Sequence, residues 1–111
     1  MQIKKLYQQQ AETFQLLSHP VRLQILDELR RREACVCHLQ AVTGKPQAYV
    51  SQQLRLLKDA GLVSDEKVGQ NVFYQLNSEK TLHLLDRSLG TAGSPSDPAD
   101  CTCPFCSQIS S

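Results

Sequence analysis

The 111 residues are enough for one domain, and their composition limits what that domain can be. Hydrophobic residues make up 41%, but aromatic residues only 5% and Trp is absent, so a core must consist mainly of Leu, Val, Ile and Ala. A domain this small has little room for a deep catalytic cleft, and pairing with a second copy would bury more apolar surface. The composition therefore favours a small domain without a deep catalytic cleft.

The net charge of +1 hides an uneven distribution along the chain. Residues 1–60 contain nine Lys and Arg against five Asp and Glu, whereas residues 61–111 contain three against six. Attraction to phosphate depends on local charge, and a dimer doubles it, so the positive first half is compatible with nucleic-acid binding. An ordinary solvated surface would show the same charge pattern, so charge alone does not decide.

The N-terminal stretch and the cysteine count indicate a cytoplasmic protein without a membrane partner. Residues 1–14 contain no continuous apolar run, and no stretch elsewhere approaches the length of a membrane span, so neither a signal peptide nor a transmembrane helix is expected. Five cysteines are an odd number, which excludes a complete set of internal disulfides. Because cytosolic thiols stay reduced, clustered cysteines there indicate metal or redox chemistry.

The first half of the chain begins with two predicted helices. Apolar residues recur at helical spacing over 4–17, which predicts the first helix. Ser18 is expected to be the N-cap of a second helix, with Pro20 in its first turn. The basic run 30–32 suits the C-terminal end of that helix, where the helix dipole favours cations.

A helix pair joined by a short turn follows. A third helix is predicted over roughly 35–42, and residues 43–46 end it and start a fourth helix over about 47–60. Gly61 is expected to end the fourth helix as its C′ residue. The inward face of the fourth helix is predicted to carry Val50, Leu54, Leu57 and Ala60.

The second half of the chain predicts a β-hairpin, a last helix and a tail. Segments 62–67 and 72–76 flank a turn in which Gly69 supplies a positive φ, and Ser78 caps a helix over about 79–89. After Gly90 the composition changes to a proline-broken linker. We therefore expect a mainly α domain with a small β-hairpin over residues 1–90, and a flexible cysteine-rich tail over 91–111.

The third and fourth helices form a helix-turn-helix pattern, and the hairpin after them would be a wing. Gln and Arg suit hydrogen bonding to base edges, Ser suits a base or a phosphate, and Lys suits phosphates. The outer face of the fourth helix offers Gln47, Ser51, Gln52 and Arg55 for reading DNA. Contacts to the DNA backbone or the adjacent groove are predicted for Lys45, Lys58, Lys67, Gln70 and Asn71.

Three stretches of the chain resemble the ArsR/SmtB family of winged-helix, metal-responsive repressors. Residues 16–26, LLSHPVRLQIL, are similar to its second-helix signature, residues 50–63 to its recognition helix and the following turn, and residues 68–74 to its wing. Together they cover roughly residues 10–89. The resemblance implies a homodimer joined through the first and last helices, which binds double-stranded operator DNA when free of ligand and releases it when an inducer binds.

Residues 35–39, CVCHL, resemble the metal-binding motif of the same family at the start of the third helix. On a regular helix Cys35 and Cys37 would point roughly 200° apart and could not both bind one ion. They can do so at a frayed N-terminus, or if binding unwinds that turn. Because the third helix abuts the recognition helix, such a distortion would couple ion binding to loss of DNA.

The tail cysteines Cys101, Cys103 and Cys106 are expected to complete the ligand set. Some arsenic-sensing members carry a third cysteine just after the pair and others carry N-terminal cysteines, but this chain has neither. The eleven-residue linker from Gly90 to Cys101 spans roughly 18 Å on average, which reaches the same subunit or its mate. Three thiolates suit As(III), four suit Zn or Cd, and clustered thiolates select soft ions, Pb included.

Two histidines near these groups are not expected to be ligands. On a helix His38 points away from both cysteines, so we place it at the surface or beside the ligands. Some relatives hold zinc on the last helix, where this chain offers His83, Glu79 and Asp86 but no second histidine. We expect no zinc site there, and His83 partly buried at the dimer face.

Three alternatives use the same cysteines differently. The first keeps the fold but makes the signal a thiol oxidation or persulfide at paired cysteines. The second is a haem-responsive regulator, suggested only by the dipeptide Cys103-Pro104. The third, a thiol oxidoreductase using residues 103–106, is rejected because such sites open a helix after a strand. No other catalytic motif is present, so we expect neither an enzyme nor a small organic substrate.

Overall fold

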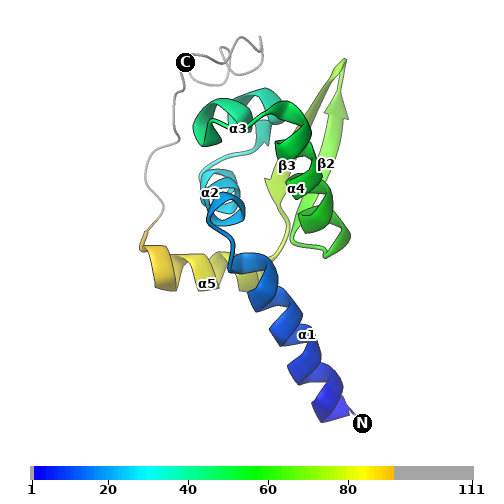
Figure 1. Ribbon diagram of the computed structural model, residues 1–111, viewed down its shortest axis with the longest axis vertical. Helices are drawn as coiled ribbons and strands as arrows, with labels where there is room; N and C mark the ends of the chain where they lie inside the picture. The colour runs from blue at the N-terminus through cyan, green and yellow to red at the C-terminus, as the bar shows by residue number, and fades with distance from the viewer. Residues whose placement is uncertain (1, 92–111) are drawn as a thin grey trace.

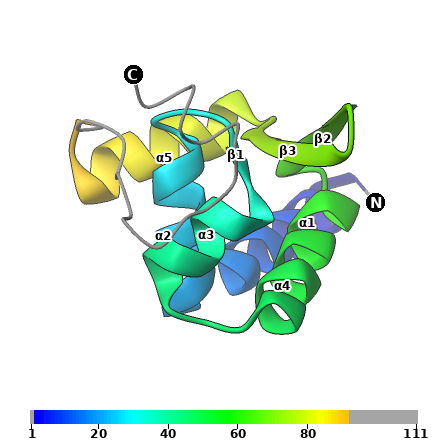
Figure 2. The ribbon, with the colours of Figure 1, turned by 90° about the horizontal axis from the view of Figure 1, so that it is seen from above.

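A computed structural model describes residues 2–91, which form five helices and a three-stranded sheet (Figures 1 and 2). Most of this order was predicted, and the mainly α architecture with a β-hairpin is confirmed. The tail predicted over 91–111 lies outside the described residues, apart from residue 91. In chain order the elements are α1 (Gln2–Leu17), α2 (Pro20–Leu29), β1 (Ala34–Cys35), α3 (Val36–Thr43), α4 (Gln47–Asp59), β2 (Val63–Val68), β3 (Asn71–Leu76) and α5 (Glu79–Leu89).

The sheet is antiparallel with strand order β1-β3-β2. Its hairpin pairs Val68 with Asn71 across a turn in which Gly69 has a φ of 65°, as predicted. The short strand β1 is a correction, because it was predicted as the start of the third helix. It pairs Cys35 with Phe73 of β3, so Cys35 precedes α3 instead of belonging to it.

The helix-turn-helix consists of α3 and α4, as predicted. Gly44, with a φ of 70°, ends α3, and Pro46 precedes the first turn of α4. The predicted inward side chains of α4 are buried except for Ala60. Ala60 is exposed and lies beyond the helix as its C-cap, because α4 ends at Asp59.

The hydrophobic core lies where α2, α3, α4 and α5 meet. It is aliphatic, as the composition predicts, and fully buried side chains come from all four helices. Burying such side chains is the main stabilising contribution to a domain of this size. The largest of them are Ile25, Leu26, Leu39, Leu54, Leu57 and Leu85.

The two predicted helix caps differ in outcome. Ser78 accepts a hydrogen bond from the backbone N–H of Thr81 at 3.1 Å, so this cap is confirmed. The Ser18 cap is wrong, because α2 has His19 at its N-cap and the Ser18 hydroxyl instead donates to the Gln15 carbonyl of α1. The N-terminus of α2 therefore has no side-chain cap.

Helix α1 projects away from the other elements (Figure 1). Its large apolar side chains Leu6, Tyr7 and Phe14 are 52%, 69% and 54% exposed in the single chain. None of the helices over residues 2–91 is long and apolar enough to cross a bilayer.

Candidate functional site

The outer face of α4 carries the polar side chains that were predicted to read DNA. Gln47, Gln52 and Arg55 are exposed and Ser51 is half-buried, while the opposite face of α4 is in the core. In both views α4 lies on the same side of the molecule as the β2–β3 hairpin (Figures 1 and 2). A helix and a hairpin on one side are what a winged helix-turn-helix needs to contact one duplex.

Polar contacts on its inner face hold α4 against α2. The Nε of Arg22 donates to the Oε1 of Gln53 at 2.7 Å, and the hydroxyl of Tyr49 lies 3.4 Å from the Nε2 of His19. Gln53 is only 6% exposed. The sequence analysis missed these contacts. Gln53, next to the predicted inward residue Leu54, could have indicated a polar contact at the inner face of α4.

Lys45, just before α4, and Lys58, in its last turn, have partners within the chain. The ammonium of Lys58 donates to Asp65 of β2 at 2.9 Å, and this hydrogen bond, with the attraction of the carboxylate, raises the pKa of Lys58. Lys45 lies 5.9 Å from the centre of the Tyr49 ring. Lys58 therefore joins α4 to the wing, and a DNA phosphate would have to compete with Asp65 for it.

The tip of the hairpin carries the remaining residues predicted to contact DNA. Lys67 and Gln70 are exposed, and Asn71 is half-buried at the start of β3. The placement of these side chains is compatible with a wing, and their contacts with DNA stay predictions.

Cys35 and Cys37 lie at the junction between β1 and α3. Cys35 is 5% exposed and has extended backbone, with φ −87° and ψ 168°, at the N-cap of α3. Cys37 is half-buried in the first turn of the same helix. Because Cys35 lies outside the helix, the separation of roughly 200° that a regular helix imposes does not apply to the pair.

The donor chemistry fits a soft ion, but the described residues provide only part of a site. Thiolates are the ligands that soft, thiophilic ions prefer. Within residues 2–91, no group of three or more His, Cys, Asp and Glu side chains is placed to hold a metal ion. The predicted ligands Cys101, Cys103 and Cys106 lie outside the described part.

His38 contradicts its predicted surface position, because its side chain is completely buried. Its Nε2 lies 3.0 Å from the Oε1 of Glu28, and its Nδ1 lies 3.1 Å from the guanidinium of Arg32. The sequence did not reveal this burial because Glu28 belongs to α2, ten positions earlier. The segment between them is rich in arginine, which is typical of a surface.

Arg30 ties the end of α5 to the end of α2. Its guanidinium bonds to Asp27, to Asp86 at 2.7 Å and to the carbonyl of Gly90 at 2.6 Å. Gly90, which follows α5, therefore lies beside Arg30, just after the end of α2. Asp86 is engaged by this contact, and His83 is exposed in the single chain.

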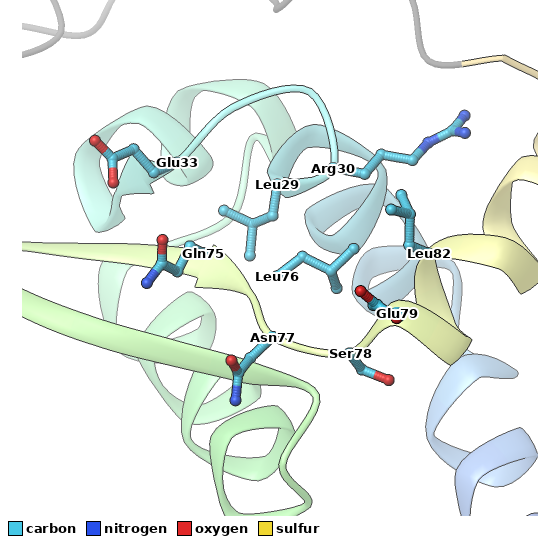
Figure 3. A pocket seen from close by; sticks show the side chains of 9 residues that line it. All are labelled: Leu29, Arg30, Glu33, Gln75, Leu76, Asn77, Ser78, Glu79 and Leu82. Carbon is cyan, nitrogen blue, oxygen red and sulfur yellow. The ribbon is translucent and has the colours of Figure 1, made fainter.

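A shallow depression of about 500 Å³ lies between the ends of α2 and β3 and the start of α5 (Figure 3). Leu29, Leu76 and Leu82 line its centre, and the Arg30 side chain points away from them toward α5. It includes neither cysteine of the CVC motif and none of the residues predicted to contact DNA.

Comparison with known proteins identifies the family. A family model for bacterial regulatory proteins, arsR family, matches residues 19–65. Over 77 residues the chain is 42% identical to the transcriptional repressor SmtB homolog of Synechocystis, covering 69% of this chain and 58% of that protein. It is 35% identical over 79 residues to the arsenical resistance operon repressor of Bacillus subtilis, covering 70% of this chain and 75% of that repressor.

A solved structure shares both sequence and fold with the chain. It is the homodimeric winged helix-turn-helix DNA-binding domain Mb0332 of Mycobacterium bovis, with a TM-score of 0.71 and 30% identity over 78% of this chain and 80% of that one. The chain spans less than two thirds of the length of the SmtB homolog. The two sequence relatives are repressors by name, in agreement with the rejection of an enzyme. The chain is a winged helix-turn-helix protein that belongs to the arsR family of bacterial regulatory proteins.

Proposed function

We propose that this chain is a cytoplasmic, homodimeric repressor that releases operator DNA when a soft ion binds the thiolates of Cys35 and Cys37. The observation that carries the proposal is the position of the pair. It lies at the junction from which α3, the first helix of the helix-turn-helix, begins. Any ligand that pulls on both sulfurs acts directly on the element that supports the reading helix.

For DNA binding, α4 would enter the major groove. Arg55 would donate to guanine, while Gln47 and Gln52 would contact base edges or, with Ser51, phosphates. The exposed placement of these side chains on α4 supports this role. Lys45 and Lys58 would contact phosphates around the groove. The wing would reach the adjacent groove or backbone through Lys67, Gln70 and Asn71.

Ion binding would oppose DNA binding because the two cysteines belong to different elements, the sheet and the helix α3. Cys35 is buried and paired with Phe73 in the sheet, whereas Cys37 is half-buried in the first turn of α3. Drawing both sulfurs onto one ion therefore displaces the first turn of α3, and α3 packs against α4. In this mechanism α3 has two arrangements, one that favours DNA binding and one that favours ion binding. The difference couples the cysteine pair to the DNA-binding face of α4.

The remaining ligands would come from Cys101, Cys103 and Cys106, in the same subunit or its partner. Arg30 at the end of α2 holds Gly90, the residue from which the chain continues toward them. As(III), Cd, Pb and Zn are the candidate ions, since all bind thiolates. The name of the Bacillus relative, an arsenical resistance operon repressor, favours testing arsenic first.

A dimer would bury the apolar side chains that the single chain leaves exposed. Leu6, Tyr7 and Phe14 of α1 and Leu89 of α5 are between 47% and 69% exposed. Large apolar side chains exposed on two helices in this way suggest an interaction surface. The Mycobacterium structure is described as homodimeric, which supports the same assembly here.

A titration of two forms of the protein tests the proposal. The forms are the intact chain and a chain ending at Gly90, each bound to a duplex selected from random DNA by the ion-free protein. Under reducing conditions, As(III), Cd(II), Pb(II) and Zn(II) are added separately, and DNA release and thiolate absorption in the ultraviolet are recorded. We expect at least one ion to release DNA stoichiometrically from the intact protein.

The shortened chain should need at least about tenfold more of that ion because it lacks the tail ligands, a loss of about 1.4 kcal/mol of binding free energy. Equal titrations of both forms would contradict the role of the tail cysteines. Release only after oxidation or persulfide treatment would replace the metal signal by a redox signal.

A further inference from the structure

Glu28 and His38 form a buried pair of polar side chains in the described part of the fold. Glu28 is 2% exposed and His38 is 0% exposed, and their side chains are 3.0 Å apart. Burying a carboxylate and an imidazole is unfavourable, and apolar residues of similar volume would serve stability as well or better. Stability alone therefore gives no reason for this pair.

The contacts define how the imidazole is held. A guanidinium can only donate, so the Nδ1 of His38 accepts from Arg32, and its Nε2–H donates to Glu28. Arg31 lies 3.4 Å from the other oxygen of Glu28. Both ring nitrogens of His38 are thus bonded, which fixes the orientation of its ring and of the helical turn that carries it.

The pair joins the thiol segment to α2. His38 directly follows Cys37 in the first turn of α3. Consecutive residues on a helix point about 100° apart, so the thiol and the imidazole lie on different sides of this turn. Glu28 belongs to the last turn of α2. The other end of α2 holds the reading helix through the contacts of Arg22 with Gln53 and of His19 with Tyr49.

We propose that Glu28 and His38 are a positioning pair that makes ion binding at Cys37 move α3 as a unit. This inference rests on the proposed function. With the pair intact, the first turn of α3 cannot fray alone, so displacing Cys37 displaces α3 and its contacts with α4. Without the pair, the turn adapts locally, and the ion is bound while the reading helix keeps its place.

The test replaces both partners at once, because a single change would leave the other buried group without the bond that joins the two. The double variant Glu28→Leu/His38→Leu is compared with Glu28→Gln, which keeps an acceptor for His38. The control is Glu33→Gln, whose side chain is exposed. For each protein the measurements are Cd(II) affinity, operator affinity with and without saturating Cd(II), and amide hydrogen exchange of residues 36–39 without metal.

We expect Cd(II) to weaken operator binding of the unmodified protein and the control by about 5–150-fold, the usual range of allosteric coupling. In the double variant this factor should fall below about 3-fold, which is smaller than the usual range of coupling factors. In the double variant, Cd(II) affinity and metal-free operator affinity should be retained, and amide exchange at residues 36–39 should accelerate. Glu28→Gln should retain most of the response to Cd(II).

Two outcomes overturn the inference while leaving the proposed function intact. One is an unchanged Cd(II) response in a folded double variant. The other is a parallel loss of stability and metal-free operator affinity with the response preserved, which would make the pair merely structural. If the unmodified protein keeps its operator at saturating Cd(II) and under every other soft ion, the proposed function itself is wrong, and this inference with it.

Discussion

Replacing either Cys35 or Cys37 with Ser is expected to abolish the release of operator DNA by soft ions. A serine hydroxyl keeps its proton at neutral pH and is a hard donor, so each change removes one of the two thiolates at the start of α3. The factor by which the ion weakens DNA binding should fall from about 5–150 to about 1. Titrations of operator complexes with As(III) and Cd(II), followed by fluorescence anisotropy, measure this factor.

The metal-free operator affinity of both serine variants should stay close to that of the unmodified protein. Val36→Ala is the matched control, because Val36 lies between the two cysteines and its truncation leaves both thiols in place. It should respond to the ions like the unmodified chain. A serine variant that still releases its DNA at the same ion concentration would remove the thiol pair from the mechanism.

The second large effect is expected from Arg55→Ala on the exposed face of α4. A bidentate contact between arginine and guanine contributes about 1–3 kcal/mol to discrimination, so operator affinity should fall by about 5–150-fold. The loss should be confined to the selected operator, with binding to unrelated duplexes nearly unchanged. Affinities for both duplexes at one fixed salt concentration are the measurement.

Arg87→Ala provides the control for charge, because Arg87 is an exposed arginine of α5. It should leave operator affinity within about twofold, since a distant exposed charge is largely screened. Lys67→Ala on the wing should weaken both duplexes alike and reduce the salt dependence by about one unit. If Arg55→Ala behaves like Arg87→Ala, α4 does not read the operator as proposed.

Local signals explain why much of the fold could be predicted. Helical spacing placed α4 and its outer face, because one apolar stripe per 3.6 residues also defines the opposite polar face. Gly69 and Ser78 were predicted correctly because a hairpin turn and an N-cap depend on residues only a few positions away. The prediction of Ser18 as N-cap was wrong because both Ser18 and His19 precede Pro20, and α2 has His19 at its N-cap.

Features that depend on distant partners could not be predicted. Strand β1 has two residues, too few for any periodicity, and exists because Cys35 pairs with Phe73 on β3. The burial of His38 depends on Glu28, which the intervening arginines made look like part of a surface. For the thiol site the sequence supplied the donors, but the extended backbone at Cys35 follows from the sheet.

The opposition between sulfur ligation and DNA binding is tested most directly by measuring Cd(II) affinity twice, on the free protein and on the protein saturated with its operator. Coupling between two sites is reciprocal, so DNA must weaken ion binding by the same factor as the ion weakens DNA binding. We predict a loss of Cd(II) affinity on operator-bound protein of about 5–150-fold, equal to the release factor. Equal Cd(II) affinities for free and DNA-bound protein would contradict the proposed mechanism.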